Sequence, residues 1–232
     1  MVGQRPMAGQ MREGLVIKAV FFDLDETLID RTSSIARYMR KLYARHQLPP
    51  EGYPAFYQRF VELDRYGYAI RAEVFETLLR EFAIAATVEA WLEDFRQNAW
   101  TECECFPDTT HVLQTLRQCG YKLGIITNGS SESQRAKIRA ANLAAQVDVI
   151  LVSAEEGITK PDPAIFLRAA ARLHVPPAAS LFIGDNPEAD ILGAQAAGMQ
   201  GVWVKRHLPW PDTPVQSCHA IAELAELLTL SF

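Results

Sequence analysis

Two aspartates, Asp23 and Asp25, stand one residue apart in the stretch VFFDLDETL, directly behind an apolar run. Successive side chains of a strand point to opposite faces, so carboxylates at this spacing can perform different tasks at one site. One could attack an electrophilic centre while the other transfers a proton. Two like charges this close also repel each other by kcal/mol amounts unless a cation lies among them. The pair therefore predicts a catalytic or cation-binding site.

Other polar residues also follow apolar runs or stand in the loops between them. Taken singly, each has an ordinary explanation as a turn residue, a helix cap or a solvated charge. Together they gather where the strands of a parallel sheet would end. They are Thr127, Asn128 and Gly129 after one run, Gly184, Asp185 and Asn186 after another with Asp190 one turn further, and Lys160 in the loop before Pro161.

Carboxylates that converge at one edge of a sheet favour a hard cation, and Mg²⁺ prefers oxygen ligands of this kind. A protein-bound Mg²⁺ ion usually keeps positions for water, which phosphate oxygens can take. Lys160 and the backbone N–H groups near Asn128 and Gly129 could hold the remaining phosphate oxygens. The sequence therefore predicts phosphate chemistry beside a magnesium site.

The elements that must position these residues alternate between strands and helices. Continuous apolar character indicates strands buried on both faces, as in a parallel sheet covered by helices. Helical patterns end at Gly120, near Asn142 and at Gly198, and another begins at Asp162 with Pro163 in its first turn. The alternation predicts a doubly wound α/β fold. The expected strands are 16–22, 122–127, 147–152, 181–184 and 201–205.

Residues 31–98 interrupt this alternation, because they carry helical patterns rich in aromatic residues and no strand pattern. An insertion directly after the first strand would lie above the carboxyl ends of the strands, where ligands bind in open α/β sheets. We therefore expect a helical cap over 31–98 and an α/β core formed by 15–30 and 99–232. The alternative is a helical domain with only a packing role. Residues 1–14 lack periodicity and are expected to form a flexible tail.

Four motifs together resemble those of the haloacid dehalogenase-like (HAD) superfamily of phosphohydrolases. They are Asp23-Leu24-Asp25-Glu26-Thr27, Thr127-Asn128, Lys160-Pro161, and Gly184-Asp185-Asn186 with Asp190, and they occur in the family's order. The resemblance covers residues 17–203, and the insertion resembles the helical cap of the family's first cap class. It implies a Rossmann-like core with a five-stranded parallel sheet and the first strand in its centre.

The resemblance also implies how the reacting groups divide the work. Asp23 would be the nucleophile that forms an aspartyl-phosphate, and its carboxylate would also bind Mg²⁺. Asp25 would act as general acid and then general base, and would offer its backbone carbonyl to the metal. Lys160 would neutralise charge on the nucleophile and on the transferring group. Such roles suit phosphoryl transfer, in which positioning and charge neutralisation supply most of the rate.

The remaining motif residues would bind phosphate or surround the metal. By the same resemblance, Thr127 and Asn128 would bind phosphate oxygens. Asp185 would be a direct metal ligand. Asn186 would lie next to the metal ligands without binding the metal, and Asp190 would hold metal-bound water or orient the motif lysine.

The aspartate at position 25 narrows the reaction. Dehalogenases of the family lack an aspartate there, and so does the phosphonate-cleaving branch, which uses a cap lysine; the cap contains only Lys41. A phosphotransferase or phosphomutase remains an alternative, as does a catalytically silent phosphate-binding regulatory protein. A silent relative would be expected to have lost Asp23, Asp25 or Lys160, and all three are present. Hydrolysis of a phosphomonoester is the favoured reaction.

The sequence indicates the substrate less specifically than it indicates the reaction. The turn around Gly67 separates two helical patterns and is expected to reach the pocket, where Arg65, Tyr66 or Arg71 could contact the leaving group. The alternative is that all three are ordinary residues of a helix surface. Glu26 makes the first motif resemble the nucleotidase-like branch of the family. Nucleoside monophosphates, sugar phosphates and phosphoglycolate-like compounds are therefore all candidate substrates.

The overall composition argues against several other classes of protein. A formal net charge of -5 and the lack of long basic runs argue against binding to nucleic acid. The apolar stretches are too short to span a bilayer and the N-terminus lacks a signal-peptide core, so we expect a cytoplasmic protein without a membrane partner. The four cysteines are too few and irregular for a disulfide framework, and Cys103 with Cys105 is a lone C-x-C without the second half of a zinc site. We expect a monomer or homodimer.

Overall fold

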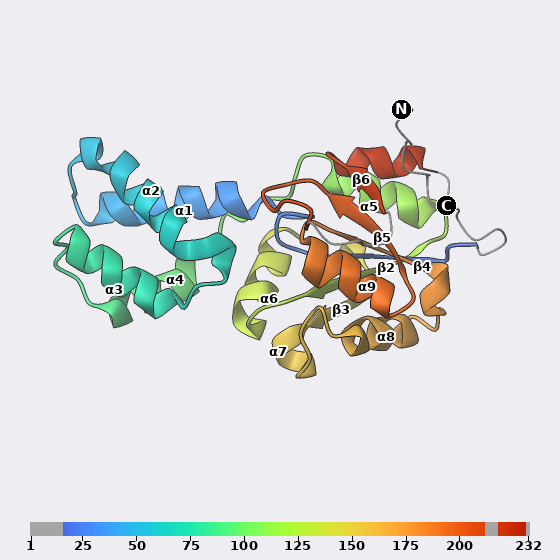
Figure 1. The fold of residues 1–232 in the computed structure, drawn as a ribbon. Coiled ribbons are helices and arrows are strands. Elements are labelled where there is room, and N and C mark those ends of the chain that lie inside the picture. Colours follow the sequence, from blue (N-terminus) through green and yellow to red (C-terminus); the bar gives the residue numbers. More distant parts are fainter. Residues whose placement is uncertain (1–15, 212–217, 231–232) are drawn as a thin grey trace, which may run out of the picture. The chain divides into compact units, whose positions relative to one another are not determined.

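The chain divides into two compact units in the computed structural model, which describes residues 16–211 and 218–230. One unit contains the chain before Arg31 and after Glu104, and the other consists of Arg31–Glu104 (Figure 1). The second unit extends past Asn98, where the sequence analysis ended the cap. The expected tail, 1–14, lies outside the described residues.

The first unit is built on a six-stranded sheet in the order β3-β2-β1-β4-β5-β6, and every pair of neighbouring strands is parallel (Figure 1). The strands are β1 Ala19–Phe22, β2 Lys122–Thr127, β3 Val149–Val152, β4 Ser180–Gly184, β5 Gln200–Val204 and β6 His219–Ile221. β1 pairs with both β2 and β4 and is central among the first five strands. The expected parallel α/β sheet is thus confirmed, with one additional strand.

Apolar runs predicted the strands imperfectly at both ends of the chain. Strand β6 was not predicted, because His219 and Ala220 are exposed and only Ile221 is buried, so that no apolar run marks the strand. The first strand was expected to begin at Val16, but this residue is 71% exposed and lies before the paired residues. Strand formation depends on a neighbouring strand as well as on local residue type.

Helices lie between successive strands from β1 to β5. Ser130 and Asp162 accept hydrogen bonds from backbone N–H groups in the first turns of α6 and α8, which fixes where these helices begin. Gly120, Asn142 and Gly198 have left-handed backbones and follow helix ends, as predicted. The helices are α5 Thr109–Gln118, α6 Ser131–Ala140, α7 Ser153–Glu156, α8 Pro163–Arg172 and α9 Gly193–Ala196, with a π-helical segment Pro187–Leu192 before α9 and 3₁₀ segments Ala144–Gln146, Pro177–Ala179 and Leu224–Thr229.

A cluster of apolar side chains joins the sheet to α8. Phe21, Ile126 and Phe182 of the strands share this cluster with Ile165 and Phe166 of the helix, and all five are fully buried. Each side chain of this size stabilises the fold by roughly 1.5–3 kcal/mol when it is fully buried. The packed core holds the strands in register and thereby fixes the positions of their ends.

Aromatic side chains form much of the core of the second unit. Phe75 and Phe56 place ring edges against Trp91, with ring centroids 5.3 and 6.2 Å apart. The buried indole has a polar partner, because Trp91 Nε1 donates to His46 Nε2 at 2.8 Å. No helix in 16–211 or 218–230 is long and apolar enough to cross a membrane. The helices of the second unit are α1 Arg31–Arg45, α2 Tyr53–Asp64, α3 Arg71–Glu81 and α4 Val88–Asn98, with 3₁₀ segments Pro50–Gly52 and Arg65–Gly67.

Candidate active site

Three neighbouring strands end together at one edge of the sheet. Phe22, the last residue of β1, is in register with Ile125 of β2 and with Ile183 of β4. The N–H of Asp23 donates to Ile183 O at 2.9 Å, which ties the residue after β1 to β4. The residues that follow β1, β2 and β4 therefore leave the sheet at its carboxyl edge, where open α/β folds bind ligands.

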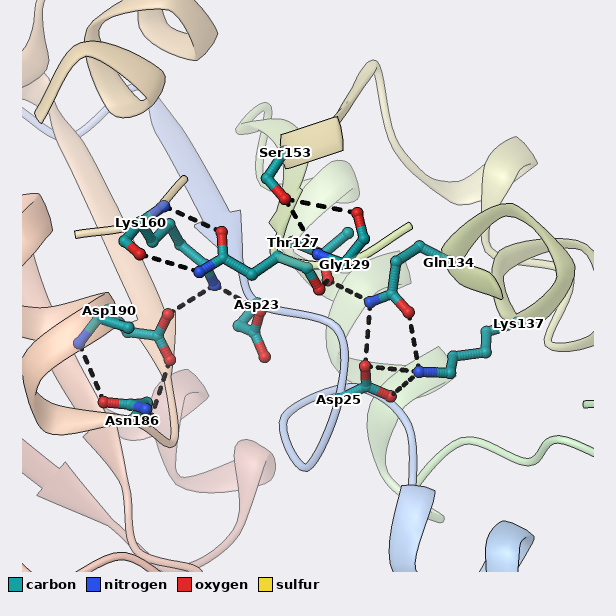
Figure 2. A network of polar contacts seen from close by, with 12 residues as sticks. Asp23, Asp25, Thr127, Gly129, Gln134, Lys137, Ser153, Lys160, Asn186 and Asp190 are labelled. Carbon is teal, nitrogen blue, oxygen red and sulfur yellow. Dashed lines mark hydrogen bonds and ion pairs between the residues drawn. The ribbon is translucent and has the colours of Figure 1, made fainter. Parts of the chain in front are cut away.

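Three buried carboxylates and one buried lysine meet at this edge. Carboxylate oxygens of Asp23, Asp185 and Asp190 lie within 4.8 Å of one another. Lys160 Nζ lies 2.5 Å from Asp23 Oδ1 and 2.6 Å from Asp190 Oδ1, and Figure 2 shows the lysine between these two carboxylates. The structure thus brings together four of the residues that the sequence analysis selected.

The low polarity of the surroundings and the crowding of like charges shift the ionisation of this cluster. Burial raises the pKa of Asp23 to about 7 and that of Asp185 to about 9, and neighbouring carboxylates add to both shifts. Burial alone would lower the pKa of Lys160, but Asp190 and Asp23 outweigh it and hold the pKa above its ordinary value. The cluster therefore accepts additional positive charge readily.

The donor set fits a divalent cation. When all three carboxylates are ionised, they and the one ammonium group leave two negative charges in excess, which one divalent ion would balance. Two carboxylates at this separation repel each other by about 3–4 kcal/mol at an effective dielectric constant of about 20. All the ligand atoms are oxygens, which suits Mg²⁺. Asp23 and Asp185 could hold such an ion, whereas both carboxylate oxygens of Asp190 already have partners, Lys160 Nζ and Asn186 N.

Asn128 holds the backbone of Lys160 from both sides. Its Nδ2 donates to Lys160 O at 2.9 Å, and its Oδ1 accepts from Lys160 N at 2.9 Å. The Asn128 side chain thus orients the lysine, and a contact from Asn128 to phosphate would have to come from its backbone. The N–H of Gly129, which was expected near phosphate, donates instead to Ser153 Oγ at 3.0 Å.

Asp190 is positioned by the turn that follows β4. Its Oδ2 accepts from Asn186 N at 3.0 Å, while Asn186 Oδ1 caps the helical segment by accepting from Glu188 N and Ala189 N at 3.0 and 2.9 Å. Gly184 allows this arrangement, because a Cβ at that position would lie 2.5 Å from Asp190 Cβ. Asn186 therefore shapes the loop that presents Asp190 to the lysine.

Asp25 lies in a second polar network beside the first. Lys137 Nζ lies 2.8 and 2.7 Å from its two carboxylate oxygens, and Gln134 Nε2 donates to Asp25 Oδ2 at 3.0 Å. Gln134 Nε2 also contacts Thr127 Oγ1 at 2.5 Å. Figure 2 shows the Asp25 carboxylate turned toward these α6 side chains. The two aspartates of the first motif thus face different partners, as their spacing predicted.

Sequence reasoning missed three residues that hold this site. Gln134 and Lys137 are buried on α6, and Trp203 Nε1 donates to the backbone O of Asp185 at 2.9 Å. A signal was present for the first two, because Gln134 lies three positions before Lys137 and four before the apolar Ile138, so that the three residues share the inward face of the helix. The indole contact joins a residue of β5 to the residue that follows β4, and it leaves no local signal in the sequence.

The candidate specificity residues belong to the second unit. Arg65 and Tyr66 are exposed and have positive φ values of 48° and 57°, followed by Gly67 at 91°. Arg71 has a largely buried side chain, its Nη2 lies 2.6 Å from Asp64 Oδ1, and its guanidinium stands 4.7 Å from the centre of the Phe95 ring. Arg65 and Tyr66 are thus available to solvent at a strained turn, whereas Arg71 is engaged inside the unit.

Comparisons with known proteins match nearly the whole chain. The model of the haloacid dehalogenase-like hydrolases matches residues 17–198. A glyceraldehyde 3-phosphate phosphatase from Pyrococcus abyssi is 32% identical over 197 residues, which are 82% of this chain and 82% of the relative. An (S)-2-haloacid dehalogenase from a Pseudomonas species is 26% identical over 222 residues, with 91% of this chain and 95% of the relative covered.

A solved structure has a similar fold over the same span. The HAD-hydrolase YfnB from Bacillus subtilis, solved with magnesium bound, aligns with a TM-score of 0.73 and 26% identity. The alignment covers 92% of this chain and 98% of that one. The similarity therefore extends over both compact units and is not limited to the motifs.

Proposed function

Because the chain belongs to the haloacid dehalogenase-like hydrolase family and is a phosphatase of that family, we propose that it hydrolyses small phosphate monoesters with Mg²⁺ through an aspartyl-phosphate on Asp23. The main support for the proposal is that the carboxylates of Asp23 and Asp25 have different partners. Asp23 lies with Lys160 among buried carboxylates, whereas the carboxylate of Asp25 contacts Lys137. A nucleophile and a proton-transfer group require such different surroundings.

Two displacements at phosphorus account for the reaction. Asp23 attacks phosphorus, the bond from phosphorus to the ester oxygen breaks, and Asp25 gives its proton to that oxygen, so that the alcohol leaves. Asp25 then takes a proton from water as the water attacks the aspartyl-phosphate. Inorganic phosphate is released and the Asp23 carboxylate is restored. Lys160 and the Thr127 hydroxyl stabilise negative charge on the transferring group.

The side chains of Asp23 and Asp185 and the backbone carbonyl of Asp25 would hold Mg²⁺. The ion, when bound, supplies positive charge beside the phosphoryl group. Asp190 orients Lys160, whose ammonium group it contacts at 2.6 Å, rather than binding the ion itself.

Two alternatives to a phosphatase can be distinguished from it. Carbon–halogen cleavage is disfavoured by Asp25, because the dehalogenases of the family lack an aspartate at this position. A silent phosphate-binding protein would bind phosphate esters without releasing inorganic phosphate. Incubating the protein with a panel of phosphate esters, with and without Mg²⁺, and measuring released phosphate tests the proposal. Binding without phosphate release would overturn it.

The substrate class is a small phosphorylated metabolite. The similarity to a glyceraldehyde 3-phosphate phosphatase makes triose phosphates the first compounds to test. Nucleoside monophosphates, sugar phosphates and phosphoglycolate-like compounds complete the panel. We further propose that the strained turn at Arg65 and Tyr66 contacts the leaving group, and that Arg71 holds this turn through Asp64.

Removal of the metal is expected to abolish turnover. Excess EDTA should stop phosphate release and added Mg²⁺ should restore it. Asp185→Asn should raise the Mg²⁺ concentration for half-maximal activity by at least ~10-fold, because the site loses a charged ligand. Glu188→Gln, which removes a nearby exposed carboxylate, is the matched control and should leave the requirement unchanged. Full activity of the parent in excess EDTA would contradict the metal assignment.

Changes at the turn should alter substrate preference more than catalysis. We expect Arg65→Ala or Tyr66→Ala to change the ranking of kcat/KM across the ester panel, because each would remove a contact with the leaving group. The rate of hydrolysis of acetyl phosphate, whose leaving group is minimal, should stay within ~3-fold of the parent's rate. A residue that contacts only the leaving group does not affect all substrates equally, as a residue at the reacting centre would.

The control for this experiment is Arg59→Ala, which removes an arginine of the same unit that pairs with Glu62 and Glu81. It should leave the ranking unchanged. Parallel losses on all substrates, acetyl phosphate included, would assign the turn a structural role.

A further inference from the structure

A buried lysine on α6 has no part in the reaction steps proposed above. The side chain of Lys137 is 4% exposed, and its Nζ lies within 2.8 Å of both carboxylate oxygens of Asp25. The next residue, Ile138, is buried and apolar, as the inward face of a helix normally requires. A buried ammonium group is costly unless it is paired and hydrogen-bonded. The placement of Lys137 is therefore explained by the carboxylate that it contacts.

Gln134 connects this ion pair to the opposite side of the site. Its Oε1 accepts from Lys137 Nζ at 2.8 Å, and its Nε2 donates to Asp25 Oδ2 at 3.0 Å and to Thr127 Oγ1 at 2.5 Å. Gly129 leaves room for the amide, because a Cβ there would lie 3.1 Å from Gln134 Cδ. The proton-transfer carboxylate is thereby linked through one amide to the hydroxyl assigned to phosphate.

The network also keeps the two aspartates of the first motif apart. Within the described residues, the group of carboxylates that could hold a metal contains Asp23, Asp185 and Asp190, and does not contain Asp25. A carboxylate free to rotate so close to a cation site would compete for the cation. Two contacts from Lys137 and one from Gln134 oppose that rotation.

We infer that Lys137 and Gln134 are positioning residues for Asp25, which hold its carboxylate in line for proton transfer and outside the cation site. The inference rests on the proposed phosphatase reaction. Neither residue contacts the reacting atoms in this arrangement: Lys137 acts through Asp25, and Gln134 acts through Asp25 and the Thr127 hydroxyl. Their loss should slow the proton-transfer steps and spare the steps that need no proton.

The decisive experiment compares two leaving groups in the Lys137→Met protein. The rate of phosphoenzyme formation is measured by rapid quench with p-nitrophenyl phosphate and with an alkyl phosphate. We expect the rate with the alkyl ester to fall about 10²-fold, as for a misplaced catalytic group, and the rate with the aryl ester to stay within ~3-fold of the parent.

Adding the same substitution to an Asp25→Asn protein tests whether Lys137 affects the rate through Asp25. In an Asp25→Asn protein, adding Lys137→Met should lower the rates by no more than ~3-fold, because a positioning residue has nothing left to position. The matched control is Arg135→Met, which removes a cation from the same helix that pairs with Glu155. It should leave the ratio of the two ester rates unchanged.

If circular dichroism shows that the Lys137→Met protein is unfolded, the Gln134→Met protein is used in the same experiment. It should change the ratio of the alkyl-ester rate to the aryl-ester rate in the same direction. Equal losses on both esters, an unchanged ratio, or full additivity with Asp25→Asn would overturn the inference alone. A parent protein that neither forms a phosphoenzyme nor releases phosphate would overturn the proposed function itself.

Discussion

Asp23→Asn should lose turnover by a factor on the order of 10⁴ to 10⁶, as nucleophile deletions do in other covalent enzymes. An amide is a poor nucleophile for phosphorus, and the change also removes a charged ligand from the cation site. The loss should be similar for alkyl esters, aryl esters and acetyl phosphate, because Asp23 must form a bond to phosphorus with every substrate. Steady-state phosphate release across the ester panel measures the effect.

The fold should tolerate this substitution. Asparagine has nearly the same shape, and Lys160 keeps its contact with Asp190 at 2.6 Å. Thermal unfolding with and without Mg²⁺ checks this point. Asp162→Asn is the matched control, since it changes an aspartate that caps α8 outside the site and keeps a side-chain oxygen for the cap. Turnover of Asp23→Asn near the parent's rate would contradict the assignment of the nucleophile.

Asp25→Asn should trap the reaction between its two displacements. A good leaving group departs without protonation, so p-nitrophenyl phosphate should still phosphorylate Asp23. Release of phosphate requires water to lose a proton, and loss of the general base should slow that step by about 10²- to 10⁴-fold. The result is a burst of one p-nitrophenolate per site followed by slow turnover, which stopped-flow absorbance would record.

The same variant should fail differently with an alkyl phosphate. An alkoxide leaves poorly without a proton, so no burst is expected and phosphorylation itself becomes slow. The parent protein is the control for both esters. A burst of equal size and rate with the alkyl ester would mean that another group donates the proton, and Asp25 would lose its assigned role.

The site was largely predictable because parallel strands end at a common edge. Asp23, Thr127 and Asp185 each follow an apolar run or end one, so the sheet alone brings them to the same edge. Lys160 was identified from its motif, but its contacts with two carboxylates depend on how the loop before α8 packs against the strand ends. Local patterns do not determine such loop positions.

What the sequence could not provide is the network that surrounds these residues. Sequence reasoning assigned Asn128 to phosphate, yet its side chain binds the backbone of Lys160, 32 positions away. The ion pair between Asp25 and Lys137 spans 112 positions. Contacts of this kind follow from the packing of α6 and the loops on the sheet, and the periodicity of the sequence does not predict them. β6 was missed for a related reason, because three residues with one buried side chain are too short to form a pattern.

The identity of the phosphorylated residue is the most direct test of the proposed nucleophile. Asp25→Asn is mixed with p-nitrophenyl phosphate and Mg²⁺, quenched in acid during the burst, reduced with borohydride to convert an acyl phosphate into a stable alcohol, digested and sequenced by mass spectrometry. We expect a single modified residue, Asp23, and no modification in a protein that also carries Asp23→Asn. Modification of any other aspartate, or of a serine, threonine or histidine, would contradict it.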